Sequence, residues 1–176
     1  MLILGILAFV LFALGDYNDA YLRKKSLKPC FAIGVAMLCL ASVWKLDIGS
    51  AKLLWFILAA VFLAYLLKAL FGSFSNSEAY TGAPQEREVD DAGLYALCRH
   101  PGVLFFTGLY ICLHFGLSLP LADSIVYIAL NIILAFLEDR IFFPKFLNGY
   151  DEYKKAVPFL IPTKESIRNS HRKTEN

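Results

Sequence analysis

An arginine and a histidine lie side by side at Arg99 and His100, directly before Pro101 and an apolar run of residues 103–119. Ionisable side chains beside a membrane-spanning run are costly unless they are paired or face water, so such a pair indicates a functional site. Proline suits the first position of a helix, where its missing N–H would have no intrahelical partner. We therefore expect the pair at the positive end of a helix dipole, beside free backbone N–H groups that attract a carboxylate or a phosphate.

A second set of charged residues, Glu138, Asp139 and Arg140, stands where the last apolar run of the chain ends. Taken alone, these could be ordinary interface residues that pair with one another or with nearby lysines. Pro144 follows them, and its missing N–H and its ring interrupt a helix. We therefore expect the last apolar helix to end before Pro144, with the acidic pair at its polar end.

Beyond Pro144, aromatic and apolar residues recur at helical spacing, at Phe146, Tyr150, Tyr153 and Val157. Charged residues occupy the rest of the helical wheel, which is the pattern of an amphipathic helix. A short helix of this kind can lie on a membrane or cover a pocket, although such a stripe is more often simple packing.

The elements that must position these residues are hydrophobic. Of the 176 residues, 58% are hydrophobic, only 18% are charged and fifteen are Phe, which is typical of an integral membrane protein. A spanning helix needs about 20 mainly apolar residues, and interfacial Tyr, Trp and Lys can extend a shorter run. Five runs qualify: residues 2–14, 30–44, 53–74, 103–119 and 125–137. We expect an all-α polytopic membrane protein with about five transmembrane helices and a short C-terminal amphipathic helix.

The polar segments between the runs are too short to form a second core, so residues 1–176 are predicted to form a single membrane domain. Residues 1–74 would hold three spans, and residues 75–100 a cytosolic connection that carries the charged pair. Residues 101–143 would form a helical hairpin, and residues 144–176 a cytosolic C-terminal segment.

The orientation follows from the basic residues in the first connection and in the tail: Arg23, Lys24, Lys25, Lys28, Lys164, Arg168, Arg172 and Lys173. The positive-inside rule places both groups on the cytoplasmic side. Five spans then put the N-terminus outside, and they bring the Arg-His-Pro stretch and the C-terminus together at the cytoplasmic face.

Net charge and cysteine spacing point away from several classes of partner. The formal net charge of +2 gives no reason to expect nucleic acid, and basic residues beside the spans suit anionic membrane lipids. The four cysteines form no CxxC pair, and no His or Cys stands at metal spacing. We therefore expect neither a disulfide framework nor a metal site.

Taken together in chain order, the two charged stretches resemble the isoprenylcysteine carboxyl methyltransferase family and its relatives among the phospholipid methyltransferases. The matching elements are Gly-x-Tyr followed by Arg-His-Pro, an acidic pair at a helix end, and Phe-x3-Tyr-x2-Tyr-x3-Val-Pro-x2-Ile-Pro. They fall on Gly93, Tyr95, Arg99, His100, Pro101, Glu138, Asp139, Phe146, Tyr150, Tyr153, Val157, Pro158, Ile161 and Pro162. The resemblance covers about the C-terminal half, and residues 1–74 match only as generic spanning helices.

The chain departs from the family's pattern at four places. Val103 stands where the family usually has Tyr, and Phe105 or Phe106 stands where it has Gly. Asp139 replaces the second Glu of a Glu-Glu pair, and Leu147 replaces the Gly of Phe-Gly. The lost tyrosine bears on the substrate side of the site.

The resemblance implies an S-adenosylmethionine pocket between the start of the fourth spanning helix and the C-terminal segment, open to the cytosol. The implied cofactor-binding residues are Gly93, Leu94, Tyr95, His100, Pro101, Glu138, Asp139, Tyr150 and Tyr153. Their chemistry is suitable, because Arg99 and His100 can bind the cofactor's carboxylate, and Glu138 can accept from its ammonium or ribose hydroxyls. A tyrosine can stack on the adenine or face the sulfonium.

The implied catalytic residues are Arg99, His100, Glu138 and Arg140. Methyl transfer needs mainly alignment, because a sulfonium is already activated. A carboxylate acceptor is ionised at pH 7 and needs no base, so Arg140 or Arg99 would orient it. A thiol or an amine needs a base, for which His100 is the candidate. The acceptor would be a lipophilic small molecule or a lipidated substrate that enters from the bilayer.

Two other functions stay open. Sterol reductases carry a similar Arg-His-Pro stretch and C-terminal Tyr and Pro pattern, which would make the chain an NADPH-dependent membrane oxidoreductase. The phosphates of NADPH call for cationic groups, however, whereas residues 75–92 hold five acids and one opposing cation: Glu78, Glu86, Glu88, Asp90, Asp91 and Arg87. The other alternative is a non-catalytic lipid-binding membrane scaffold, supported mainly by Val103.

Two further segments could contribute to such a site. The connection of residues 75–92, with Gly82 and Pro84, could act as a lid or serve as a plain solvated linker. Asp16 and Asp19 lie three residues apart at the end of the first apolar run, on one face of a helix. We expect them to cap the helix at the interface, and a part in substrate entry stays open.

Overall fold

The computed structural model of the protein describes residues 1–50, 52–71, 88–89 and 91–174. All the regular secondary-structure elements within these ranges are helices, which confirms the all-α expectation. The helices are α1 (Leu2–Tyr17), η1 (Asn18–Leu22), η2 (Lys25–Leu27), α2 (Cys30–Val43), η3 (Ile48–Ser50), α3 (Leu53–Phe71), η6 (Gly93–Ala96), α5 (Pro101–Leu117), α6 (Leu121–Leu137), η7 (Glu138–Phe142), α7 (Phe143–Phe146), α8 (Tyr150–Ala156) and α9 (Lys164–Thr174). The connection predicted as a lid or linker lies mostly outside the described residues.

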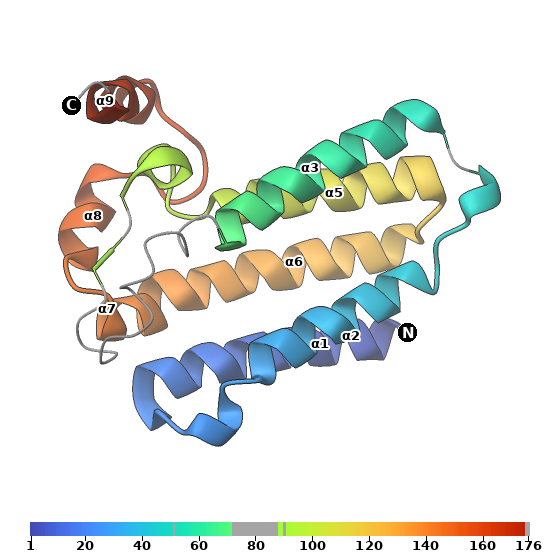
Figure 1. The fold of residues 1–176 in the computed structure, drawn as a ribbon, viewed down its shortest axis with the longest axis horizontal. Helices are drawn as coiled ribbons and strands as arrows, with labels where there is room; N and C mark the ends of the chain where they lie inside the picture. Colours follow the sequence, from blue (N-terminus) through green and yellow to red (C-terminus); the bar gives the residue numbers. More distant parts are fainter. Residues whose placement is uncertain (51, 72–87, 90, 175–176) are drawn as a thin grey trace.

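The long helices α1, α2, α3, α5 and α6 run alternately up and down in one bundle (Figure 1). The first connection, η6 and the whole segment from η7 to α8 therefore lie at one end of the bundle, which we call the α8 end. The element η3 and the turn between α5 and α6 lie at the opposite end. The alternation brings segments that are far apart in the sequence together at the α8 end.

Among the described residues, four helical stretches are long and apolar enough to cross a membrane: Leu2–Leu22, Lys25–Val43, Leu53–Phe71 and Leu121–Phe146. The helix α5 is also apolar but has 17 residues. Large apolar side chains such as Ile3, Val43 and Leu53 are more than 60% exposed, as expected for side chains that face lipid. These features are consistent with a membrane protein.

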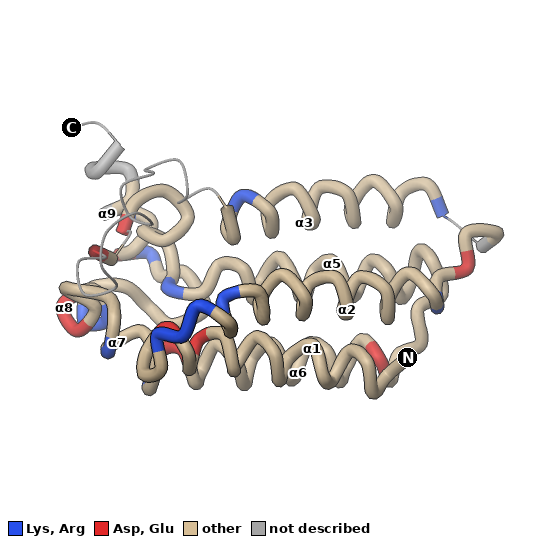
Figure 2. The backbone as a smooth tube through the Cα atoms, turned by 60° about the horizontal axis from the view of Figure 1, so that its bottom comes forward, with Lys and Arg blue, Asp and Glu red and all other residues tan. Residues whose placement is uncertain are grey.

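Charge is distributed unevenly along the bundle. Figure 2 shows that most Lys and Arg residues gather at the α8 end, while few charges lie along the long helices between the two ends. The basic residues of the first connection lie in η2 and around it, beside the end of α1.

The core forms where α6 packs against α1 and α5, while α2 covers α1 and α3 covers α5. Aromatic rings fill its centre: Phe9 packs edge to face on Phe106 at 6.0 Å, and Tyr110 on Tyr127 at 5.5 Å. Gly5 allows α1 to approach Tyr127 of α6 closely, because a Cβ at this position would overlap the tyrosine ring. Packing of this kind, rather than burial from water, holds helices together in a membrane.

Both helices that carry acidic residues at the α8 end continue further than expected. The first continues through the π-helical turn η1 and ends after Leu22, where Arg23 adopts a left-handed conformation and the Asn18 side chain binds both the N–H and the carbonyl of Lys24. Likewise, α6 continues through η7 and α7 to Phe146.

Pro144 therefore does not interrupt the helix, contrary to the expectation. In the π-helical turn η7, the N–H of Phe143 binds the carbonyl of Glu138, five residues earlier. Pro144 then falls in the first turn of α7, where a missing N–H is tolerated.

The chain instead reverses at residues 147–149. Leu147 is extended, and Gly149 has a φ of +77°, a left-handed conformation that favours glycine. The aromatic stripe predicted for one amphipathic helix is thus divided between α7 and α8. In α8, Tyr150 and Tyr153 pack with Val157 against Tyr95 and Phe143 of the bundle end.

Candidate active site

An ion pair between Arg99 and Asp139 forms the centre of the α8 end. Arg99 Nε donates to Asp139 Oδ1 at 2.7 Å, although the two residues are 40 positions apart in the sequence. The guanidinium also donates from Nη1 to the carbonyl oxygens of Lys154, at 2.9 Å, and of Val157. The Arg99 side chain is 9% exposed, so this buried guanidinium ties the start of α5 to both η7 and α8.

Asp139 is the most connected side chain of the site and is 1% exposed. Besides Arg99, its carboxylate accepts from the Tyr150 hydroxyl at 2.8 Å and forms an ion pair with Lys154 Nζ at 3.1 Å. Lys154 Nζ also donates to the Asp139 backbone carbonyl at 2.9 Å. A buried carboxylate with these partners is compensated, which is the condition under which a buried charge is tolerated.

The segment after α8 lies alongside the residues before α5. The Arg99 N–H donates to the carbonyl of Pro158 at 2.9 Å, and the His100 N–H donates to that of Phe159 at 3.2 Å. These two backbone N–H groups were expected to be free for an anion, and that expectation is wrong. The segment after Val157 is therefore held against the start of α5 by backbone hydrogen bonds from Arg99 and His100.

His100 occupies the N-cap position of α5 and Pro101 its first turn, as predicted. The imidazole is 5% exposed and stacks on Phe143 at 5.8 Å, with Phe159 edge-on at 5.1 Å. Its Nδ1 lies 3.5 Å from Glu138 Oε2. Its Nε2 lies 3.8 Å from Asp139 Oδ1, which is too far for a hydrogen bond, and it has no hydrogen-bond partner among the described residues.

The surroundings of the ring act on its protonation in opposite directions. Burial lowers the pKa of His100, but attraction to the carboxylates of Asp139 and Glu138 outweighs it, so the net pKa is raised above its ordinary value. A histidine whose Nδ1 faces a carboxylate and whose Nε2 is unoccupied has the arrangement of a general base.

Glu138 keeps more freedom than Asp139, since its side chain is 20% exposed. Asp16 lies near the end of α1, and α1 contacts η7, which carries Glu138. The end of the first helix therefore lies beside the turn that carries Glu138, because α1 contacts η7 and η1 contacts α7.

The predicted tyrosines and the glycine hold η6 in place. The Tyr153 hydroxyl donates to the carbonyl of Tyr95 at 2.7 Å, and the Tyr95 hydroxyl donates to the carbonyl of Ala69 in α3 at 2.8 Å. Gly93 has a φ of +54°, a left-handed conformation that explains a glycine there. The half-buried Leu94 accepts a hydrogen bond from the Leu97 N–H within the turn.

Arg140 does not join the other predicted residues. Its side chain is 61% exposed, and the guanidinium lies over the ring of Phe136 at 5.5 Å. The nearest carboxylate oxygen of Asp139 is 3.8 Å from its Nε. An exposed pair of this kind contributes little, so Arg140 belongs to the surface of the site.

Lys154 is a central residue that the sequence did not single out as part of the site. It lies one helical turn after Tyr150, and this i, i+4 spacing puts both on the face of α8 that meets Asp139. The spacing was visible in the sequence, but Lys154 was assigned to the polar side of the wheel. In the structure, its ion pair with the buried Asp139 places the Lys154 ammonium on the inner side of α8.

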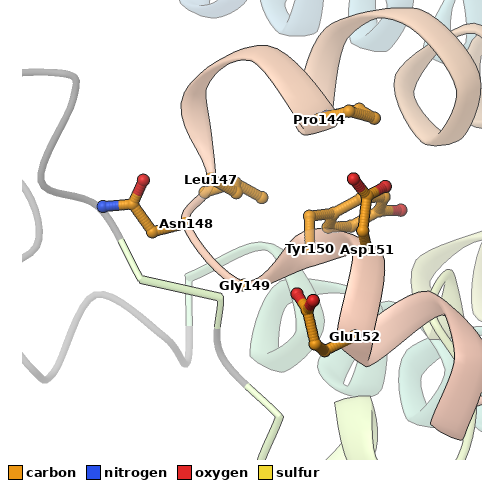
Figure 3. Close-up of a pocket in the computed structure, with 7 residues that line it drawn as sticks. All are labelled: Pro144, Leu147, Asn148, Gly149, Tyr150, Asp151 and Glu152. Atoms are coloured by element: carbon orange, nitrogen blue, oxygen red, sulfur yellow. The ribbon is translucent and has the colours of Figure 1, made fainter.

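Two shallow cavities adjoin at the reversal before α8. One, of about 220 Å³, is lined by Pro144, Leu147, Asn148, Gly149, Tyr150, Asp151 and Glu152 (Figure 3). The other, of about 330 Å³, is lined by Glu88, Val89, Asp91, Asn148 and Gly149. Of the nine predicted cofactor-binding residues, Tyr150 lines one of these two cavities and the other eight line neither. The predicted catalytic residue Arg99 also lines neither.

In the described part of the chain, no group of three or more His, Cys, Asp or Glu could hold a metal ion. Cys98, next to Arg99, is 1% exposed, and burial raises the pKa of its thiol to about 11. It is therefore a packing residue rather than a nucleophile.

In comparisons with protein-family models, curated proteins and solved structures, no match to this chain was found. The methyltransferase resemblance of the sequence therefore stays a prediction. Function has to be inferred from the chemistry of the site, since a helical bundle alone does not specify it.

Proposed function

We propose that the protein is an integral membrane S-adenosylmethionine-dependent methyltransferase that acts on an amphiphilic acceptor entering from the bilayer. One observation carries this proposal: the three sequence elements that resemble the methyltransferases meet at Asp139. Arg99 comes from the first element, Asp139 from the second and Tyr150 from the third. Sequence resemblance alone does not require these residues to touch.

The proposed topology has five spans, with the N-terminus outside and the site and C-terminus in the cytoplasm. The alternating bundle and the basic residues at the α8 end support it. The helix α5, with 17 residues, falls at the short end of the roughly 17–25 residues that span a bilayer.

The residues of the site divide into two groups. The first group consists of Asp139 and its two cationic partners, Arg99 and Lys154. Arg99 also donates to a backbone carbonyl of α8, so this group positions the site rather than binds a ligand. His100 Nε2 has no hydrogen-bond partner among the described residues, and Glu138 is partly exposed. We therefore assign the proton transfer and ligand contacts to His100 and Glu138.

Adenosylmethionine would supply the methyl group as an activated sulfonium. The residues at this end fit a cofactor of that kind, because carboxylates that can accept from its ammonium and ribose hydroxyls are present at Glu138, Asp151 and Glu152. Asp151 and Glu152 line the cavity beside Tyr150, whose ring suits an adenine (Figure 3).

The same cavities disfavour the reductase alternative. Four carboxylates line them, from Glu88, Asp91, Asp151 and Glu152, and within the described residues no Lys or Arg does. The phosphates of NADPH are bound by cationic side chains or by backbone N–H groups at helix N-termini. The cavities therefore suit a cationic, hydroxyl-bearing cofactor better.

The geometry also favours an acceptor that must lose a proton. A carboxylate acceptor would need a free cation, but the Arg99 guanidinium already donates to Asp139 and to the carbonyls of Lys154 and Val157, and Arg140 faces outward. An amine or a thiol needs a base, and His100 is placed to serve with its Nε2. We therefore propose an amine or thiol acceptor rather than a carboxylate.

Calorimetric titration of the detergent-purified protein with S-adenosylhomocysteine, with NADPH in parallel, tests the proposal. We expect micromolar binding of S-adenosylhomocysteine that is weakened in Glu138→Gln and unchanged in Asp47→Asn, a control carboxylate exposed at the opposite end of the bundle. Binding of NADPH instead would assign the protein to the reductases. Binding of neither ligand by folded protein would favour the scaffold.

A further inference from the structure

The last helix of the described chain, α9, runs across the direction of the bundle. Figure 1 shows it nearly end-on at the α8 end, whereas the long helices lie across the view. A helix that crosses the direction of the spanning helices lies along a membrane surface rather than through it. Helices of that kind carry cationic residues on a polar face, with apolar residues beside them.

The start of α9 is held in place by the chain itself. The Ser166 N–H donates to Thr163 Oγ1 at 3.1 Å, and the Thr163 N–H donates to Ser166 Oγ at 3.0 Å, which is a reciprocal helix cap. Ser166 is 2% exposed, and α9 contacts η6, the turn that precedes Arg99. One face of α9 is therefore buried at the bundle end, and this fixes the direction of its other face.

The exposed side of α9 combines cations with apolar side chains. Lys164 and Arg168 are exposed and stand four residues apart, so they lie on one face of the helix. Two large apolar side chains are exposed close to them in the sequence, Ile161 at 74% and Ile167 at 43%. Within the described chain, no carboxylate forms an ion pair with either cation. This side of α9 has the composition of an interfacial helix.

Other residues mark the α8 end as the level of a membrane surface. Tyr17 and Tyr21 are exposed and pack against each other at 5.0 Å, and the basic residues of the first connection follow them. Exposed tyrosines next to basic residues are typical of the membrane–water interface. Because α9 lies at the same end of the bundle, its cations are near the headgroup layer.

We propose that α9 is an interfacial helix that binds a membrane surface rich in anionic phospholipid through Lys164 and Arg168. The charge of the helix selects this occupant, because an anionic headgroup layer attracts cations near the surface. Ile161 and Ile167 favour lipid over a soluble polyanion, since apolar side chains gain from contact with the acyl boundary. The inference goes beyond the proposed methyl transfer and does not depend on it.

Hydrogen exchange of the full-length protein in lipid nanodiscs tests this proposal, with the backbone amides of α9 as the readout. Nanodiscs of phosphatidylcholine alone are compared with nanodiscs that also contain phosphatidylserine. Binding to a surface stabilises a helix, so its amides exchange more slowly. We expect phosphatidylserine to slow exchange in α9 about 30-fold, from about 5-fold for each of the two cations, and to leave α6 unchanged.

Matched variants separate the cations of α9 from other causes. Lys164→Gln combined with Arg168→Gln should remove most of the slowing, whereas Lys52→Gln, an exposed cation at the opposite end of the bundle, should keep it. Glu165→Gln should increase the slowing, because it removes a charge that the anionic surface repels. High salt should abolish the slowing in wild type, because the attraction between exposed charges is screened.

Equal exchange of α9 in the two lipid mixtures would overturn the proposal. Slowing that persists at high salt, or in the double variant, would also overturn it. The double variant is first compared with wild type in phosphatidylcholine alone, which shows whether the helix itself has changed. If it has, the salt dependence of wild type and the effect of Glu165→Gln decide instead. Binding of S-adenosylhomocysteine is a separate measurement, so failure of this proposal and failure of the proposed function are distinguishable.

Discussion

Replacement of Asp139 by Ala should destabilise the α8 end more than any surface change, because it leaves the Arg99 guanidinium buried without its partner. The structure shows a guanidinium with 9% side-chain exposure that donates to Asp139 at 2.7 Å and 3.4 Å. Removal of one member of a buried ion pair costs about 3–5 kcal/mol. Tyr150 and Lys154 also lose their acceptor, so we expect a cost toward the upper end of that range.

The assay is thermal unfolding of the detergent-purified variants, followed by circular dichroism. At about 2–4 °C per kcal/mol for a chain of this length, a loss of about 3–5 kcal/mol lowers the Tm by roughly 6–20 °C. Asp47→Asn, the control carboxylate at the opposite end, should change the Tm by less than about 2 °C.

A double-mutant cycle separates the ion pair from simple loss of packing. Arg99→Met and Asp139→Leu together replace the pair by apolar side chains, which is often neutral for stability, so the double variant should be more stable than either single variant. The reasoning would be refuted if Asp139→Ala cost less than about 1 kcal/mol, as an exposed pair would, or if the two single effects were additive.

Three further predictions concern His100, Tyr150 and Gly149. Because the folded-state pKa of His100 is raised, the stability it adds should be fully present below its unfolded pKa of about 6.5 and be lost as pH rises through the higher folded value. Urea unfolding between pH 5.5 and 8.5 should show this fall in wild type but not in His100→Gln, and parallel curves would contradict it. Tyr150→Phe removes a hydrogen bond to a buried carboxylate, which should cost about 1.5–3 kcal/mol in the same unfolding assay, whereas an unchanged midpoint would mean that the hydroxyl is not needed. Gly149→Ala should cost about 1–2 kcal/mol because the φ of +77° disfavours a Cβ, while Gly149→Asn should cost less, and equal costs would argue against backbone strain.

The sequence predicted the helices better than their ends. Apolar runs mark α1 and α6, but both helices continue into polar residues, through η1 to Leu22 and through η7 to Phe146. Hydropathy does not register this continuation, because the polar residues are satisfied by partners that are distant in sequence or by turn geometry. Asn18, for example, is 1% exposed and ends its helix through two hydrogen bonds to Lys24.

The sequence also predicted most residues of the candidate site, but not which of them pair with one another and which can contact a ligand. The sequence predicts that Arg99 binds a ligand, but in the structure its guanidinium donates to Asp139 and to the carbonyls of Lys154 and Val157. That outcome depends on the reversal at Gly149, which folds α8 back onto the start of α5, and no local pattern encodes the resulting distances. For the same reason, the sequence does not show that Arg140 is exposed while the neighbouring Asp139 is buried, because exposure depends on how η7 packs.

Transfer of a tritium-labelled methyl group from S-adenosylmethionine to bilayer lipid, by the purified protein in vesicles, tests the proposed function most directly. We predict that label enters the organic-soluble lipid fraction with wild-type protein and that His100→Ala, confirmed as folded, reduces the incorporation at least 100-fold, as expected for loss of a general base. Folded wild-type protein that incorporates no label into a total lipid extract and does not bind S-adenosylhomocysteine would contradict the proposal.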